Sequence, residues 1–84
     1  MNSPRNTHAK GGLAQAAAAQ GKHSMAFVIL EEICAEPVTA AEFHILFAKE
    51  LLSDGQPREA AEQYRVAISK DHKVQTEELD YLFG

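Results

Sequence analysis

The stretch LLSDGQPREAAEQYRVAISKD, residues 51–71, places two helical segments on either side of a single glycine. Gly55 can adopt the positive φ with which many helices end. Pro57 follows two residues later and suits the first position of a new helix, where its missing N–H costs nothing. Apolar residues then recur at helical spacing from Ala60 to Ile68. The stretch therefore predicts two helices joined by a turn of a few residues.

The rest of the chain divides into helical segments in the same way, and no strand pattern competes with them. Gly21 is expected to end a first helix and Pro37 a second. The sequence TAAE that begins at Thr39 has the form of a capping box, in which Thr39 and Glu42 each bond the other's backbone N–H. Residues 1–6 carry no periodic signal and are expected to form a disordered N-terminal tail. The predicted fold class is all-α, with about five helices: near residues 7–20, 23–36, 39–54, 57 to at least 68, and 76 to the end.

Length, net charge and the single cysteine limit the classes of protein to which this chain can belong. The 84 residues leave room for one domain, and the formal net charge of −4 argues against binding to nucleic acid or to anionic membranes. The most apolar run, from Met25 to Leu30, is far too short to span a bilayer. The single cysteine, Cys34, cannot form an internal disulfide, which fits a reducing compartment. We therefore expect a soluble, cytoplasmic protein that neither binds nucleic acid nor inserts into a membrane.

The sequence also matches itself at an offset of 34 residues, with small residues on small and bulky on bulky. The matched pairs are Leu13 with Phe47, Ala14 with Ala48, Ala17 with Leu51, Gly21 with Gly55, Ala26 with Ala60, Leu30 with Tyr64 and Ile33 with Ala67. At one further offset Ile45 falls on Leu79, so the last helix has the pattern of the opening of a third unit.

A helix–turn–helix period of this length resembles the tetratricopeptide repeat (TPR) family, best over residues 41–74. The resemblance implies a right-handed α-solenoid of antiparallel helix pairs. Two departures stand out: His44 and Lys10 occupy the position where the family usually has tryptophan or another large apolar residue, and His72 replaces the usual closing proline. The implied TPR-like domain spans residues 7–84, divided into repeat one (7–40), repeat two (41–74) and a terminal helix (75–84).

In the TPR family the first helix of each unit lines a concave groove that takes peptides or helices. Carried over by position, the partner-binding groove would comprise Gln15, Ala18, Ala19, Glu42, Ile45, Leu46, Lys49, Leu52, Ser53, Thr76, Leu79 and Phe83. This mostly apolar set suits an amphipathic helix or an extended apolar segment. Lys49 is its only cation, so the carboxylate clamp of some family members is not expected. The same residues would equally form a core, covered by the terminal helix or by a second copy of the chain.

Nothing in the sequence assembles a catalytic site. The four histidines are scattered, without the spacing of a zinc site, and Cys34 lies on the apolar stripe of its helix. We therefore expect a protein that is not an enzyme and that uses no cofactor or metal.

Three functions remain open. The first is a protein-interaction module, a small adaptor or chaperone that holds an apolar segment of a protein or peptide partner. The second is a structural homo-oligomer, at its simplest a homodimer, because two repeats and a stub leave apolar faces to cover. The third is a fragment or subunit of a larger secretion or assembly machine.

Overall fold

Two glycines in the left-handed region of φ and ψ form the turns of two helical hairpins, one within residues 4–33 and one within residues 41–70. Gly21 has a φ of 78° and Gly55 a φ of 79°, which a residue with a side chain adopts only with strain. The computed structural model describes residues 4–83, with side chains described from Thr7 onward. Within that range the chain is all-helical. Its elements are α1 (Pro4–Ala19), α2 (His23–Ile33), α3 (Ala41–Ser53), α4 (Pro57–Lys70), the short 3-10 helix η1 (His72–Val74) and α5 (Glu77–Phe83).

The two turns share one hydrogen-bond pattern. The N–H of Lys22 donates to the carbonyl of Ala17 at 2.8 Å, and the N–H of Gln56 donates to the carbonyl of Leu51 at 2.9 Å. In each turn the glycine N–H also bonds the carbonyl three residues earlier, at 3.1 Å. Both turns are thus Schellman motifs, which satisfy the last carbonyls of the preceding helix. As the sequence predicts, Pro57 then stands in the first turn of α4.

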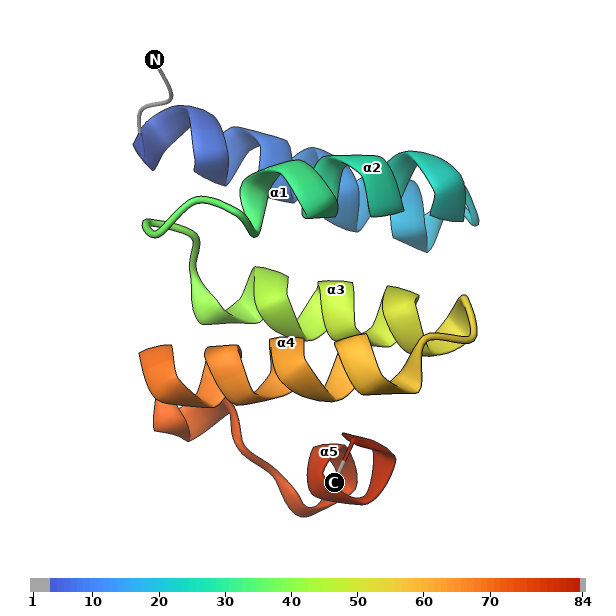
Figure 1. Ribbon diagram of the computed structural model, residues 1–84. Helices are drawn as coiled ribbons and strands as arrows, with labels where there is room; N and C mark the ends of the chain where they lie inside the picture. The colour runs from blue at the N-terminus through green and yellow to red at the C-terminus, as the bar shows by residue number, and fades with distance from the viewer. Residues whose placement is uncertain (1–3, 84) are drawn as a thin grey trace.

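The helices stack in the order of the chain. Figure 1 shows the hairpin of α1 and α2 above the hairpin of α3 and α4, with α5 seen end-on below α4. Each helix packs mainly against its chain neighbours, and α2 and α3 join the two hairpins. Alanines occupy many of the fully buried positions of these helices, and a small side chain lets two packed helices approach closely. These alanines are Ala14, Ala26, Ala48, Ala60 and Ala67.

A phenylalanine ring ties α3 to α1. Phe43 is buried, and its ring lies directly against the backbone of Gly11, where a Cβ atom would overlap it. The ring also meets His8 edge-on, with 5.9 Å between ring centroids. A glycine inside a helix costs about 1 kcal/mol relative to alanine. At Gly11 this cost is offset by the close approach of an aromatic side chain.

The start of α1 differs from the sequence prediction. The helix begins at Pro4, three residues before the expected start at Thr7. Thr7 is a buried residue within the helix, so it does not cap it. Residues 1–3 of the expected tail, like Gly84, lie outside the described residues.

The predicted capping box at Thr39 is wrong. The N-cap of α3 is Ala40, which makes no side-chain hydrogen bond, and the Thr39 hydroxyl instead donates to the carbonyl of Ile33. The end of α2 takes this hydroxyl because its last carbonyls need donors. The Lys70 ammonium adds two bonds to the same connection, at 3.2 Å to the carbonyl of Pro37 and 2.7 Å to that of Thr39.

Candidate binding surfaces

The structure keeps the predicted groove residues of α3 together on one helix. Three apolar members of the set are half-buried and pack against the core: Ile45, Leu46 and Leu52. Three polar members are exposed beside them: Glu42, Lys49 and Ser53. We call these six residues the α3 stripe. It has the mixed character of a binding surface, because half-buried apolar residues alternate with exposed polar ones along the helix.

The predicted residues outside α3 are placed less favourably for a groove. On α1, Gln15 and Ala19 are exposed, whereas Ala18 is half-buried against the core. On α5, Leu79 and Phe83 are buried within the core, so a partner cannot reach them in this arrangement.

The packing of α5 explains this burial. The rings of Phe83 and Tyr64 lie 5.3 Å apart, and the Tyr64 hydroxyl donates to Asp80 Oδ1 at 2.5 Å. Burial, together with this hydrogen bond, raises the pKa of Tyr64. Thr76, which was also expected in the groove, caps the helix by accepting the N–H of Leu79 at 3.1 Å. The terminal helix therefore covers the free side of α4 and does not extend the α3 stripe.

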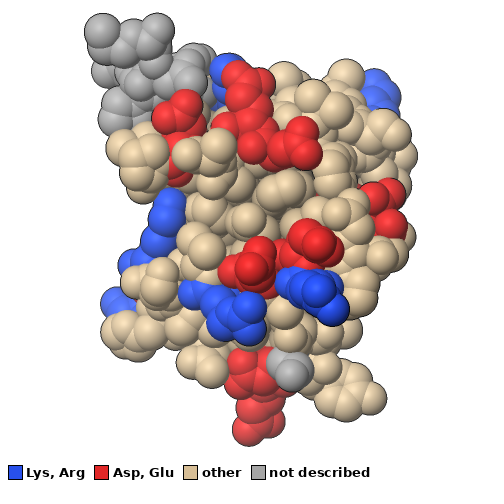
Figure 2. All heavy atoms as spheres, in the orientation of Figure 1, with Lys and Arg blue, Asp and Glu red and all other residues tan. Residues whose placement is uncertain are grey.

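Charge is unevenly spread over the surface. On the face shown in Figure 2, acidic side chains gather over the first hairpin, whereas acidic and basic side chains lie next to one another over the second. One ion pair joins α1 to α2, with 2.6 Å between Lys10 Nζ and Glu32 Oε1.

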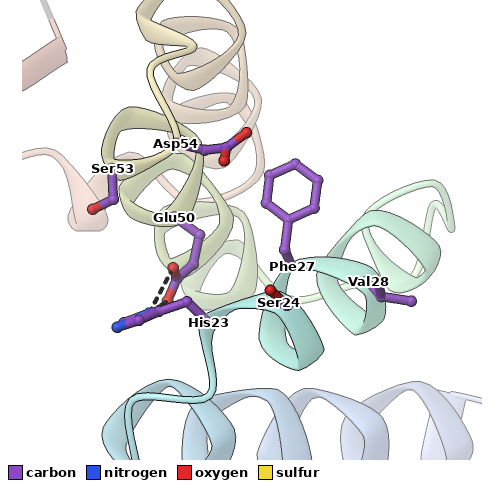
Figure 3. Close-up of a pocket in the computed structure, with 7 residues that line it drawn as sticks. All are labelled: His23, Ser24, Phe27, Val28, Glu50, Ser53 and Asp54. Atoms are coloured by element: carbon purple, nitrogen blue, oxygen red, sulfur yellow. Dashed lines mark hydrogen bonds and ion pairs between the residues drawn. The ribbon is translucent and has the colours of Figure 1, made fainter.

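A pocket of about 380 Å³ lies between α2 and α3, and the groove prediction missed most of it. Figure 3 shows its walls, in which α2 contributes His23, Ser24, Phe27 and Val28, α3 contributes Glu50 and Ser53, and Asp54 follows directly after α3. We call it the α2–α3 pocket. Ser53 is the one residue that belongs to both this pocket and the α3 stripe.

A buried carboxylate forms the polar centre of the α2–α3 pocket. Glu50 is only 7% exposed, and both of its carboxylate oxygens lie 3.0 Å from Nδ1 of His23. Phe27 is held in place by the Phe47 ring, with 5.4 Å between centroids and an angle of 77° between the planes. The sequence carried one signal for this site, because Glu50 is an acid within the buried stripe of α3, next to Leu51.

A second pocket of about 620 Å³ lies where the α2–α3 connection meets the end of α4. Its lining includes one predicted groove residue, Glu42, together with Pro37, Thr39, Ala40, Ala41, Lys70, Asp71 and Val74. The Lys70 ammonium already donates to two backbone carbonyls there, so its donors are largely used within the fold.

The half-buried Cys34 and the buried His44 both have pKa values that keep them uncharged at neutral pH. Burial raises the pKa of the Cys34 thiol to about 12, against a smaller lowering by the Lys70 charge, so the thiol stays protonated at neutral pH. Burial also lowers the pKa of His44, whose Nδ1 lies 2.7 Å from Oε1 of Gln63. The other ring nitrogen of His44, Nε2, is buried without a hydrogen-bond partner. His44 thus fills an apolar position mainly by its shape.

Over the described residues, no group of three or more His, Cys, Asp or Glu side chains is placed to hold a metal ion. In the same part of the chain, every helix is too short or too polar to cross a bilayer. Comparison with family models, with curated protein sequences and with solved structures finds no match to this chain.

Proposed function

We propose that this chain is a non-enzymatic protein-interaction module of the TPR type, which binds an apolar helix or peptide segment of a partner protein. The observation that carries the proposal is the repetition of one turn in both hairpins. The same two Schellman hydrogen bonds recur 34 residues apart, around Gly21 and Gly55. This agreement between sequence period and backbone geometry supports two copies of one helix–turn–helix unit in a right-handed solenoid.

The α3 stripe is the part of the surface best suited to the partner. In a helical repeat array the first helices of successive units face the ligand, and α3 holds this position in the second unit. Its half-buried Ile45, Leu46 and Leu52 offer apolar contact, while the exposed Glu42 and Lys49 supply one charge of each sign. Such a surface suits an amphipathic helix laid along it. The free thiol of Cys34 fits the cytoplasmic location that we propose.

The test is selection of helical peptides against the folded chain, followed by mapping of the selected peptides through amide chemical shifts. We expect the shifts to follow the α3 stripe. Leu52→Asp should lower the affinity for the selected peptides by at least about tenfold, since it removes an apolar contact and buries a charge. Val66→Asp is the matched control, because Val66 is an exposed valine on α4 and its change should leave affinity intact. Equal loss of peptide affinity in the Val66→Asp and Leu52→Asp variants would refute the proposal. So would peptides that change the amide chemical shifts of residues outside α3 only.

Self-association is the second candidate function, and one observation favours it. Leu13 on α1 is 56% exposed, although its partner in the sequence match, Phe47, is buried. A second copy of the chain would cover this leucine. Light scattering after size exclusion, over a range of concentrations, separates the two functions: a stable dimer that Leu13→Glu converts to a monomer supports self-association, and a monomer at all concentrations rejects it.

A further inference from the structure

We propose that the α2–α3 pocket binds the cationic side chain of a lysine or arginine in the partner segment. The inference rests on the proposed function. It specifies the chemical class of one side chain by which the partner segment is held. Ser53 supplies the connection, because it lies both in the α3 stripe and in the pocket wall. A segment laid along the stripe therefore passes the mouth of the pocket.

The first argument is the unused capacity of Glu50. A carboxylate offers about four acceptor sites. Among the described residues Glu50 accepts one side-chain N–H, which His23 Nδ1 shares between the two oxygens at 3.0 Å each. The Glu50 side chain is 8% exposed, so water reaches it poorly, and a buried charge without donors is costly. Further donors from a ligand would lower that cost.

The second argument is that the existing donor lies at the edge of the site. The His23 side chain is 64% exposed, whereas the Glu50 side chain is buried behind it. In Figure 3 the imidazole points at the carboxylate from the start of α2. An ammonium or guanidinium group can enter beside the imidazole or replace it, since either cation would donate to the same two Glu50 oxygens as His23 does.

The third argument is the charge and shape of the walls. A second carboxylate, Asp54, lines the pocket and is exposed, and it accepts a hydrogen bond from the neutral amide of Gln56 at 2.6 Å. None of the seven described residues that line the pocket is a lysine or an arginine. Two acids accompanied by one histidine, without a lysine or an arginine, favour a further cation.

The apolar wall selects among cations. Phe27 and Val28 form one side of the pocket, and the Phe27 ring is fixed by its contact with Phe47. Lysine and arginine side chains bury an aliphatic stem against apolar surface, and their charged heads also interact favourably with an aromatic ring. A bare metal ion would gain nothing from this wall. The geometry therefore points to a charged head on a hydrocarbon stem.

The test uses Nα-acetyl-lysine-methylamide as the probe and the norleucine analogue, which has the same length without the charge, as its matched control. Each is titrated into the isotopically labelled full chain while amide chemical shifts are recorded. We expect the lysine probe to give saturable shifts at Ser24, Phe27, Val28 and Ser53, and the norleucine analogue to bind at least about tenfold more weakly, because it lacks a hydrogen bond to a charged group. Equal shifts from both compounds would overturn the proposal.

Two variants locate the carboxylates that matter. Glu50→Gln keeps the side-chain shape and should abolish saturable binding of the lysine probe. Asp54→Asn changes an exposed residue, so this variant keeps the fold even if Glu50→Gln unfolds. It should lower the affinity for the lysine probe by about threefold, as expected for the loss of an exposed charge. Glu78→Gln on α5 is the control and should change nothing. Binding that survives both pocket variants, or that is lost in Glu78→Gln as well, contradicts the assignment.

The probe also separates this inference from the proposed function. If the lysine probe binds and no peptide is ever selected by the α3 stripe, the pocket is real and the interaction function fails. If selected peptides bind the stripe without a basic residue, and Glu50→Gln leaves their affinity unchanged, the function stands and the pocket assignment fails.

Discussion

The two hairpins share one local design but differ in what covers them. Ala14 and Ala48 are both fully buried, as are Ala26 and Ala60, and the two turns have the same hydrogen bonds. Leu13 and Phe47, however, occupy matching positions and are 56% and 7% exposed. The difference follows from the stack, because α2 packs on α3, while no described helix packs on the corresponding side of α1. Local sequence sets the hairpin, and the neighbouring hairpin sets which of its faces is buried.

The largest expected effect tests this difference directly. Phe47→Ala should lower the free energy of unfolding by about 3–5 kcal/mol, since it leaves a cavity and removes the contact with Phe27. Leu13→Ala, at the matching position, should change it by less than about 0.5 kcal/mol. Urea denaturation followed by circular dichroism measures both. Similar losses in the two variants would mean that α1 is covered in solution, as in a self-associated chain.

An intermediate effect should distinguish two adjacent glycines in α1. Gly11→Ala places a Cβ atom against the buried Phe43 ring, so we expect the variant to lose about 1–3 kcal/mol of stability through overpacking. Gly12→Ala meets no atom within 4 Å, and the gain in helix propensity should raise stability by about 0.5–1 kcal/mol. Thermal unfolding of the pair provides the measurement. Shifts of the same sign would contradict the contact between α1 and α3.

The smallest expected effect concerns His44, whose counterpart in the first hairpin is Lys10. Burial lowers the pKa of His44 below its ordinary value of 6.5, so the unfolded chain takes up a proton more readily than the folded one. The stability that neutral His44 contributes is complete above pH 6.5 and is lost as the pH falls through its lowered pKa. The melting temperature should therefore fall between pH 7.5 and pH 5, and by less in His44→Phe.

His72→Gln is the control for this prediction, because it replaces an exposed histidine of η1 in place of the buried one. The groups around His44 sharpen the expectation. Gln63 and Lys70 both come from α4; Lys70 disfavours the imidazolium form, whereas the Gln63 bond favours it. An identical pH dependence in the wild type and in His44→Phe would show that His44 does not titrate in this range.

The sequence predicted the hairpins well because their signals are local. Gly21, Gly55 and Pro57 act through the backbone of their own turn, and each stands where the sequence placed it. The TAAE signal at Thr39 was also local, but it failed because the end of α2 competed for the same hydroxyl. Leu79 illustrates the same limit. Its spacing places it on the apolar side of its helix, but only the packing of α5 on α4 decides that it belongs to the core.

The α2–α3 pocket lay beyond sequence reasoning for a related reason. His23 and Glu50 are 27 residues apart and meet only when α2 packs on α3. Each looks ordinary alone, since a histidine at a helix start and a glutamate within a helix are common. The contact depends on the angle and register between two hairpins, which a 34-residue period does not specify.

The stacking of helices in chain order has a consequence for how quickly the protein folds. Because each helix packs mainly on the one before it and the one after it, the native contacts join residues that are close in sequence. Chains with such low contact order fold within microseconds to milliseconds, as the loops that must close are short. We therefore expect each hairpin to form early in folding. The helix α5, which packs mainly on α4, is the segment whose amide hydrogens should exchange with solvent first.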